Sequence, residues 1–510
     1  MTQIQLRPAV PKDVDIVLRW PNDPFISVRS AFQREVEWTE RLNWFGETLG
    51  SNQRQMLIIL LHDQPIGLVQ FEFVHDNQCT VSIYLLPEYT GQGHGVAALK
   101  IACWKLFGDR PVAGIAALIQ KTNSRSISAF QKAGFKSVDQ AAVEVPPDHL
   151  AFYMERPTEV PHNRLTWGDS EVLGVADVVR SGYWASGPRV AKLETTLAHM
   201  ANVKSVVCVA SGLSALRLLL LGLGIKPGDK VLIPAYSCVA LANAVLACGA
   251  APVPVEIAPD DWNIDVRATK DAVYENRPKA IIAVNTFGLP SSVESIQQFE
   301  VPVVEDCSHG FGLTVNGVSL GGRSAAAILS FSATKLVGGG QGGAILSSSP
   351  AVGKFVESWR DYNDKPPDGK RLNEKMTDLE AALAQCQLNR LAEMIAARYV
   401  LAKRYHDLLV EEASHTGSFR LPNISEDRIW YRYAVEMRTA SAQSVIDSLG
   451  RLGVRTAIPV TDWRSTGMPL CPVSDRAYHG LVSLPLYPTL TQDEQDRVVH
   501  AFLAFVREHA

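Results

Sequence analysis

The sequence lacks the features that mark several broad classes of protein. Its eight cysteines include no Cys-x-x-Cys pair, so neither a metal site nor a disulfide framework is expected. No block of lysine or arginine is present and the formal net charge is −4, which argues against a nucleic-acid partner. The leucine-rich run 216–223, which contains Arg217, is far shorter than the ~20 residues of a membrane span, so no membrane association is expected.

The first residues also lack a charged head followed by an apolar core. No signal peptide is therefore expected, and the predicted location is cytoplasmic. With 510 residues, 46% hydrophobic and 20% charged, the composition is that of a globular protein too long for one ordinary core. Residues 157–168 are polar and have no helical or strand period, which predicts a linker between domains 1–156 and 169–510.

The two predicted domains differ in the order of their elements. In the first, apolar strands at 57–61, 66–73 and 80–86 precede a glycine-rich loop and an amphipathic helix, which predicts a mixed α/β domain. In the second, continuous apolar strands alternate with helices, as in a parallel sheet buried on both faces. A large doubly wound α/β domain is expected there, followed by a smaller α+β subdomain at about 411–510.

Four motifs in the second domain fall in an order that one chemistry explains. Residues 210–214 (ASGLS) follow a strand and open a helix, where free N–H groups and the helix dipole favour an anion. Asp306 ends an apolar strand, where its carboxylate can hold a heterocyclic nitrogen protonated, and His309 follows closely. Lys335 lies among small residues and suits Schiff-base chemistry. Residues 373–382 open an amphipathic helix.

Each motif taken alone also fits a purely structural role, such as a helix cap, a hairpin or a core histidine. Together they accompany the runs GYWASGPRVAKLE, SGLSALRLLLLGLGIKPGDKVLIPAYSC, VEDCSHGFG, SFSATK and NEKMTDLEAALAQCQLNRL. On these runs residues 182–505 resemble the DegT/DnrJ/EryC1/StrS family of sugar aminotransferases. The resemblance implies the fold-type I architecture, pyridoxal 5′-phosphate (PLP) as cofactor and a homodimer.

The resemblance also implies a role for individual residues. Lys335 matches the Schiff-base lysine, Asp306 the partner of the pyridine nitrogen and His309 the residue beside the ring hydroxyl. Asn373 matches the residue that reaches the phosphate held by the partner subunit. The remaining cofactor contacts implied are phosphate contacts from Gly212, Leu213 and Ser330, and a residue covering the cofactor ring, either Tyr236 or Cys238, where the family has an aromatic side chain.

In the first domain, the loop 87–96 (PEYTGQGHGV) follows a strand and opens a helix, so its N–H groups can hold a pyrophosphate. A Rossmann site is the alternative, but no βαβ unit begins the chain. With 123–135 (NSRSISAFQKAGF), residues 4–155 resemble the GNAT family of acetyl-CoA-dependent N-acetyltransferases, and 19–45 are similar to the branch that acetylates nucleotide-linked amino sugars, including the pseudaminic acid pathway enzyme. The acetyl-CoA contacts implied are Gly91, Gly93, His94, Gly95, Val96 and Asn123.

Two positions depart from the GNAT pattern. Thr90 stands where the pyrophosphate loop usually begins with Arg or Gln, and Phe130 stands where many members carry a tyrosine acid. Another acid such as Tyr84, or water, is then needed to protonate the leaving thiolate, unless the domain is inactive.

The two resemblances together predict a bifunctional enzyme. It would transfer an amino group from glutamate, releasing 2-oxoglutarate, to a nucleotide-linked 4-keto-6-deoxy sugar, and then acetylate the new amine with acetyl-CoA. The alternative is an aminotransferase that acts alone on a 3-keto sugar or a cyclitol, with an inactive or regulatory GNAT domain.

Overall fold

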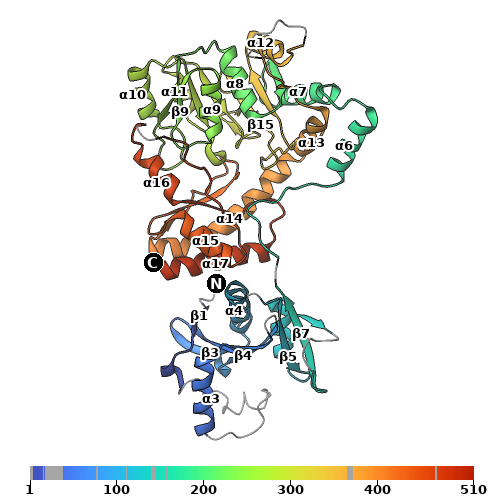
Figure 1. Cartoon of the computed structure of the whole chain (residues 1–510), viewed down its shortest axis with the longest axis vertical. Helices are drawn as coiled ribbons and strands as arrows, with labels where there is room; N and C mark the ends of the chain where they lie inside the picture. The colour runs from blue at the N-terminus through green and yellow to red at the C-terminus, as the bar shows by residue number, and fades with distance from the viewer. Residues whose placement is uncertain are drawn as a thin grey trace. The chain divides into compact units, whose positions relative to one another are not determined.

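The computed structural model describes residues 4–14, 17, 38–75, 78–110, 112–138, 145–156, 158–363, 371–465 and 468–509. Most of the stretch 19–45, which suggested an amino-sugar acetyltransferase, lies outside these residues. The chain forms two compact units (Figure 1). One comprises residues 1–159 with 451–453, and the other comprises 160–450 with 454–510. No helix in the described ranges has both the length and the apolar character needed to cross a bilayer.

The N-terminal unit is built on a seven-stranded sheet in the order β1-β2-β3-β4-β5-β7-β6. Neighbouring strands pair antiparallel, except β4 and β5, which are parallel. The strands are β1 (Ile4–Pro8), β2 (Arg54–Leu61), β3 (Gln64–His75), β4 (Gln78–Leu85), β5 (Gly114–Gln120), β6 (Lys136–Val138) and β7 (His149–Glu155). The helices are α3 (Trp38–Gly50), α4 (His94–Asp109) and α5 (Ser124–Ala133).

Both faces of this sheet are covered, which explains why β2 is a continuous apolar run. Side chains alternate across a strand, so Leu57 and Ile59 pack into one core with residues of α4 and α5. Met56 and Ile58 point to the other face and pack with Phe45 of α3. The mixed α/β character expected for this domain is confirmed, and the predicted strands overlap β2, β3 and β4.

The second unit holds a seven-stranded sheet in the order β10-β9-β11-β12-β15-β16-β8. The strands from β10 to β15 run parallel, whereas β16 is antiparallel to both of its neighbours. The strands are β8 (Ser205–Val209), β9 (Lys230–Pro234), β10 (Ala251–Val255), β11 (Ala280–Val284), β12 (Val303–Asp306), β15 (Ala326–Ser330) and β16 (Gly343–Ser347). A two-stranded hairpin, β13 (Thr314–Val315) and β14 (Val318–Ser319), lies apart from this sheet.

Helices cover both faces of the large sheet (Figure 1). One face packs against α8 (Gly212–Gly222), α9 (Val239–Ala247) and α12 (Pro350–Arg360). The other packs against α7 (Pro188–Ala201), α10 (Val266–Asn276), α11 (Val293–Gln297) and α13 (Asp378–Asn389). The doubly wound α/β fold expected for this domain is therefore confirmed.

The C-terminal part of this unit carries a three-stranded antiparallel sheet of β17 (Phe419–Arg420), β18 (Tyr433–Met437) and β19 (Leu481–Leu484). Its helices are α14 (Leu391–Thr416), α15 (Ala442–Arg451), α16 (Pro472–Gly480) and α17 (Gln492–His509). Residues 160–168, part of the predicted linker, pack within this unit ahead of α6 (Asp169–Ser181). Arg164 pairs with Glu494 at 2.7 Å, and the carbonyl of Thr166 accepts from Gln387.

Candidate active site

The start of α8 forms a compact turn at the carboxyl end of β8. Ser211 caps the helix, and its Oγ accepts from the N–H of Ser214 at 3.0 Å. Gly212 lies so close to Ser330, the last residue of β15, that a Cβ at position 212 would sit 2.8 Å from the Ser330 Cβ. Leu213 beside it is 38% exposed. The fold thus brings together three residues predicted to contact phosphate, at a helix start that favours an anion.

Asp306 lies at the carboxyl end of β12, as its position after an apolar strand predicted. It is buried, at 7% exposed, and its Oδ1 accepts from the N–H of Ser308 at 2.9 Å. His309 stacks on Tyr431 with ring centres 4.2 Å apart. Burial, with the charges of Lys335 and Arg432, holds the pKa of His309 well below its usual value, so the ring is neutral. Its buried Nδ1 has no hydrogen-bond partner among the described residues.

Lys335 is half-buried and follows β15. Its Nζ lies 5.1 Å from the centre of the Tyr431 ring, the ring on which His309 stacks. Burial alone would raise the pKa of Tyr431, but Lys335, Arg432 and a hydrogen bond with Thr334 together lower it. Lys335 also lines a cavity of about 250 Å³ with residues 163–167. Lysine, histidine and tyrosine therefore meet at one place, beside the carboxyl ends of β12 and β15.

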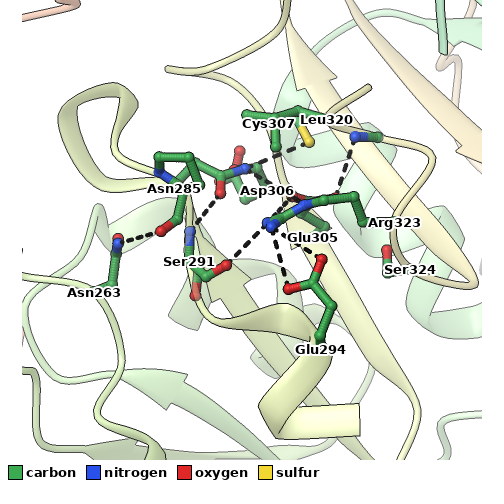
Figure 2. A network of polar contacts seen from close by, with 12 residues as sticks. Asn263, Asn285, Ser291, Glu294, Glu305, Asp306, Cys307, Leu320, Arg323 and Ser324 are labelled. Atoms are coloured by element: carbon green, nitrogen blue, oxygen red, sulfur yellow. Dashed lines mark hydrogen bonds and ion pairs between the residues drawn. The ribbon is translucent and has the colours of Figure 1, made fainter. Parts of the chain in front are cut away.

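A network of polar side chains supports the strand that carries Asp306 (Figure 2). Glu305, fully buried, accepts from Arg323 at 2.7 Å and from the Gly321 N–H at 3.1 Å. Asn285 donates to Glu305 at 3.1 Å and accepts from the N–H of Ser291 at 2.8 Å. Because the buried carboxylate of Glu305 is paired with a guanidinium and an amide, the network fixes the end of β12 and with it the position of Asp306.

Asn373 is exposed, in a segment that meets the end of β8 through a single bridge between Lys375 and Val209. The next residue, Glu374, accepts from Arg217 of α8 at 2.9 Å, and its carbonyl accepts from the N–H of Ala210 at 2.9 Å. Both side chains of this ion pair are buried. The segment that carries Asn373 is therefore anchored to the same helix whose first turn faces Ser330.

The two residues considered for the cofactor face differ in environment. Tyr236 is 1% exposed and packs edge-on against Phe287 and Tyr478, and its hydroxyl has no partner among the described residues. Burial raises its pKa well above the usual value. Cys238 instead is exposed, at the start of α9. Of the two, only Cys238 presents a side chain that a ligand can reach without repacking of the core.

In the N-terminal unit, the glycine loop leads into α4. Gly91 and Gly93 have φ of 78° and 86°, a conformation that favours glycine, and Gly93 is the N-cap of α4. His94 is buried, and its Nδ1 has no partner in the described part of the chain. Gly95 is within the first turn of α4, where an ideal Cβ would lie 3.1 Å from Leu85 Cδ1, and Val96 next to it is half-buried. Because the first N–H groups of a helix have no partner within the helix, those of this turn can donate to an anion.

The strands beside this loop separate. β4 and β5 pair in register only at Gln78–Gly114, Cys79–Ile115 and Thr80–Ala116. Among the described residues, the remaining parts of β4 and β5 do not pair with each other. Strand edges with unpaired N–H and C=O groups can accept an extended, amide-containing ligand between them. Asn123, whose Oδ1 caps α5 by accepting from Ser126, follows shortly after β5.

Neither position considered for an acid in this unit is strongly exposed. Phe130 is 3% exposed and packs edge-on against Phe135 with ring centres 4.9 Å apart. Tyr84 is half-buried on the face of the sheet that packs against α3, and burial raises its pKa despite a hydrogen bond with Ser82. Tyr84 is thus a protonated phenol at neutral pH.

Several residues near Lys335 were not predicted from the sequence. Tyr431 lies beside Lys335, and it lines a cavity with the neighbouring Thr334. The same cavity is lined by Arg432, Arg398 and His162, which come from distant parts of the chain. The only local signal is the run Trp430-Tyr431-Arg432-Tyr433, in which an arginine interrupts aromatic residues entering a buried strand.

Known proteins resemble both units. The model of the DegT/DnrJ/EryC1/StrS aminotransferase family matches residues 167–503, and that of the acetyltransferase (GNAT) domain matches residues 3–136. The 3-oxo-glucose-6-phosphate:glutamate aminotransferase of Bacillus subtilis (strain 168) is 30% identical over 375 residues, covering 68% of this chain and 83% of the relative.

Solved structures agree with these matches. NtdA from Bacillus subtilis with bound cofactor PMP has a TM-score of 0.61 at 28% identity, covering 66% of this chain and 82% of its own. DesV of S. venezuelae, in complex with a ketimine intermediate, has a TM-score of 0.62 at 26% identity, covering 69% and 98%. The chain therefore belongs to the DegT/DnrJ/EryC1/StrS family of PLP-dependent aminotransferases and carries a GNAT domain ahead of its aminotransferase domain.

Proposed function

We propose that this chain makes an N-acetylated amino sugar in two steps. The aminotransferase unit moves an amino group from glutamate to the 4-keto carbon of a nucleotide-linked 6-deoxy sugar, and the GNAT unit acetylates that amine with acetyl-CoA. The observation that carries the proposal is the presence in one chain of a domain that makes a primary amine and a domain type that consumes one.

The residues of the aminotransferase unit fit PLP. Gly212 gives the backbone the close approach that a phosphate needs beside Ser330, and the buried, unpartnered Nδ1 of His309 is a polar atom available to the ring hydroxyl. Asp306 supplies a carboxylate at the strand end for the pyridine nitrogen. When bound, PLP supplies an electron sink for the carbon from which a proton is removed.

The chain's own groups then move and hold protons. Lys335 is the catalytic base and acid: its Nζ takes a proton from the α-carbon of the donor and returns one in the sugar half of the reaction. Asp306 would hold the proton on the ring nitrogen, because a carboxylate beside a pyridine nitrogen favours the protonated ring. The neutral His309 orients the ring without adding a charge of its own.

In the GNAT unit, the free N–H groups at the start of α4 hold the pyrophosphate of acetyl-CoA, and the separated edges of β4 and β5 receive its amide arm. The uncharged amine attacks the thioester carbonyl, its nitrogen loses one proton to water, the carbon–sulfur bond breaks, and the thiolate takes a proton. Phe130 has no proton to give, so we assign this role to Tyr84 or to water.

We also propose that the enzyme is a homodimer joined through its aminotransferase units. Around α6 lie several large apolar side chains that are half or more exposed: Leu165, Trp167, Val172, Leu173, Tyr183 and Trp184. Such a set on one short stretch is typical of an interface. The exposed Asn373 would then reach the phosphate held by the partner. Light scattering of the purified protein at twice the monomer mass is the expected result.

A second candidate substrate is favoured by one specific relative. The Bacillus subtilis aminotransferase is named for a 3-oxo sugar that carries a 6-phosphate rather than a nucleotide. A 3-oxo hexose phosphate is therefore the alternative acceptor, with the GNAT unit acetylating the 3-amine or standing idle.

Mass spectrometry separates these possibilities. Nucleotide-linked 4-keto sugars and 3-oxo hexose phosphates are incubated with glutamate, PLP and acetyl-CoA, and the products are weighed. A mass gain for amine plus acetyl on a nucleotide-linked sugar is expected. Amine without acetyl on every acceptor would refute the tandem reaction and leave the aminotransferase alone, and no amine on any acceptor would refute the substrate class.

A further inference from the structure

A second group of polar side chains surrounds a small cavity beside Lys335. The cavity measures about 60 Å³, and its polar lining includes His162, Thr334, Arg398, Arg432 and Ser483. At roughly 15 Å³ for each water molecule that a cavity holds, this is room for about four water-sized atoms. The four oxygens of a phosphate group need a similar volume.

Positive charge gathers here without a counter-ion. Arg432 Nη1 donates to His162 Nε2 at 3.2 Å and lies 3.5 Å from Ser483 Oγ, and no carboxylate in the described residues pairs with its guanidinium. Arg398, which is buried, donates only to backbone carbonyls, that of Leu486 at 2.8 Å being nearest. Other buried arginines differ, because Arg217 and Arg323 each pair with a glutamate.

The partner of Arg432 keeps this charge available. Burial and the Arg432 charge lower the pKa of His162 to about 4, so the imidazole is neutral at physiological pH. Its Nε2 is then an acceptor, which orients the guanidinium but does not neutralise it. Ser483 Oγ lies 2.9 Å from the same Nε2, so both side chains to which the Arg432 guanidinium donates are uncharged. A half-buried arginine held this way retains its full charge for a ligand.

The subsite is also close to the reacting centre. The Arg432 guanidinium lies 5.3 Å from the centre of the Tyr431 ring, and Lys335 Nζ lies 5.1 Å from the same centre. Both charges act on the buried ring of His309. A substrate whose reacting carbon is at Lys335 therefore places an attached anionic group within reach of Arg432.

We propose that Arg432, oriented by His162 and Ser483, binds an oxyanion of the substrate, as a specificity-determining contact that rests on the proposed transamination. The ligand is a singly or doubly charged oxyanion that accepts hydrogen bonds from the guanidinium, and two groups have this chemistry. Its source is either the phosphate of the acceptor sugar or a carboxylate of the amino donor. His162 belongs to the segment 160–168, so this segment contributes to substrate selection.

The two half-reactions distinguish the sources. In the glutamate arm, the PLP-loaded wild type and Arg432→Gln are each mixed with glutamate alone. In the sugar arm, the same two proteins carrying pyridoxamine phosphate (PMP) are each mixed with a keto sugar phosphate or a nucleotide-linked keto sugar alone. The absorbance of the cofactor is followed in both arms. In one arm only, we expect the half-saturating substrate concentration of Arg432→Gln to be ~10- to 100-fold higher than that of wild type, because a charge-assisted contact is lost. Arg438→Gln, an exposed arginine just after β18, is the matched control and should behave as wild type.

A rise confined to the sugar arm assigns the phosphate, and one confined to the glutamate arm assigns the carboxylate. Arg432→Lys should recover part of the lost affinity because it restores the charge. Equal losses in both arms would place Arg432 in the cofactor machinery and overturn the proposal, as would no change in either arm.

A measurement without turnover separates this inference from the proposed reaction. Inorganic phosphate is titrated into PLP-loaded protein, in which the cofactor's own phosphate already occupies the start of α8, and thermal unfolding is followed. Phosphate should stabilise wild type and Arg438→Gln but not Arg432→Gln. Equal stabilisation of all three would overturn the subsite, whereas failure of wild type to aminate any sugar would refute only the proposed function.

Discussion

Each of the two units has a helix start at which we propose that a phosphate binds, but the two helix starts use glycine for different reasons. At α8, Gly212 is needed because Ser330 of another strand comes within van der Waals contact, and Ser211 caps the helix. At α4, Gly91 and Gly93 have open space around an ideal Cβ and are needed for their positive φ. One anion site is thus shaped by tertiary packing, and the other by the local backbone.

Because each site is formed within its own unit, a substitution in one unit should leave the activity of the other unchanged. Lys335→Ala should lower transamination by ~10³-fold or more, because no other group near the cofactor replaces the base. Acetyl transfer to a supplied amino sugar should be unchanged. Both activities are measured on the same preparation, and Lys354→Ala, an exposed lysine of α12, is the control. Loss of acetyl transfer in Lys335→Ala would show that the units do not act independently.

The packed site should respond next most strongly to a single methyl group. Gly212→Ala would place a Cβ 2.8 Å from Ser330, and relieving this overlap costs about 1–3 kcal/mol. We expect PLP affinity, measured by titration of the apoenzyme, to fall ~10- to 100-fold. Gly450→Ala, where the nearest atom is 3.9 Å away, should leave it unchanged. Normal PLP affinity in Gly212→Ala would contradict the role of close packing.

The backbone-defined site should respond less. Gly93→Ala meets no neighbour but must adopt φ near 86°, which costs about 1–2 kcal/mol. The half-saturating acetyl-CoA concentration should rise ~5- to 30-fold, with PLP affinity unaffected. Gly46→Ala in α3, with no positive φ and no contact, is the control. A large loss of folded protein in Gly93→Ala would mean that packing also matters at this loop.

The smallest effect concerns pH. In the second unit, burial lowers the pKa of His162 from 6.5 to about 4, so the unfolded chain binds the proton more readily. Stability from this group is full above about pH 6.5 and is lost as the pH falls toward 4. In the N-terminal unit, hydrogen bonding by Arg7 lowers the pKa of Asp13 below 3.8, so that stability is lost only at lower pH.

Calorimetry between pH 7 and 5 should therefore show the transition of the aminotransferase unit moving to lower temperature before that of the GNAT unit. His162→Asn, which still accepts from Arg432 but does not titrate, should reduce this shift. The neutral His309 contributes the same direction and should preserve part of it. If the transition of the GNAT unit moved to lower temperature first, the assignment of the pH effect to His162 would be contradicted.

Much of the site could be predicted from the sequence because its signals are local. The turn 210–214 predicts a capped helix start, although the cap is Ser211 and not Ser214, the serine nearer the leucine-rich run. Asp306 after Val303–Val304 predicts a carboxylate at a strand end. The antiparallel β16 could not be predicted, because its apolar run looks the same in either direction. The unpaired part of β4 and β5 leaves no mark on either strand's sequence.

By itself, then, the sequence identified the two families and predicted the lysine, the carboxylate and the helix starts of the candidate sites, since each depends on neighbouring residues and on motif order. Only the tertiary structure brought Gly212 against Ser330, joined Arg217 to Glu374 and set His162 beside Arg432. It also buried Tyr236 while leaving Cys238 exposed. These outcomes depend on contacts between segments far apart in the chain, and local periodicity carries no information about such pairings.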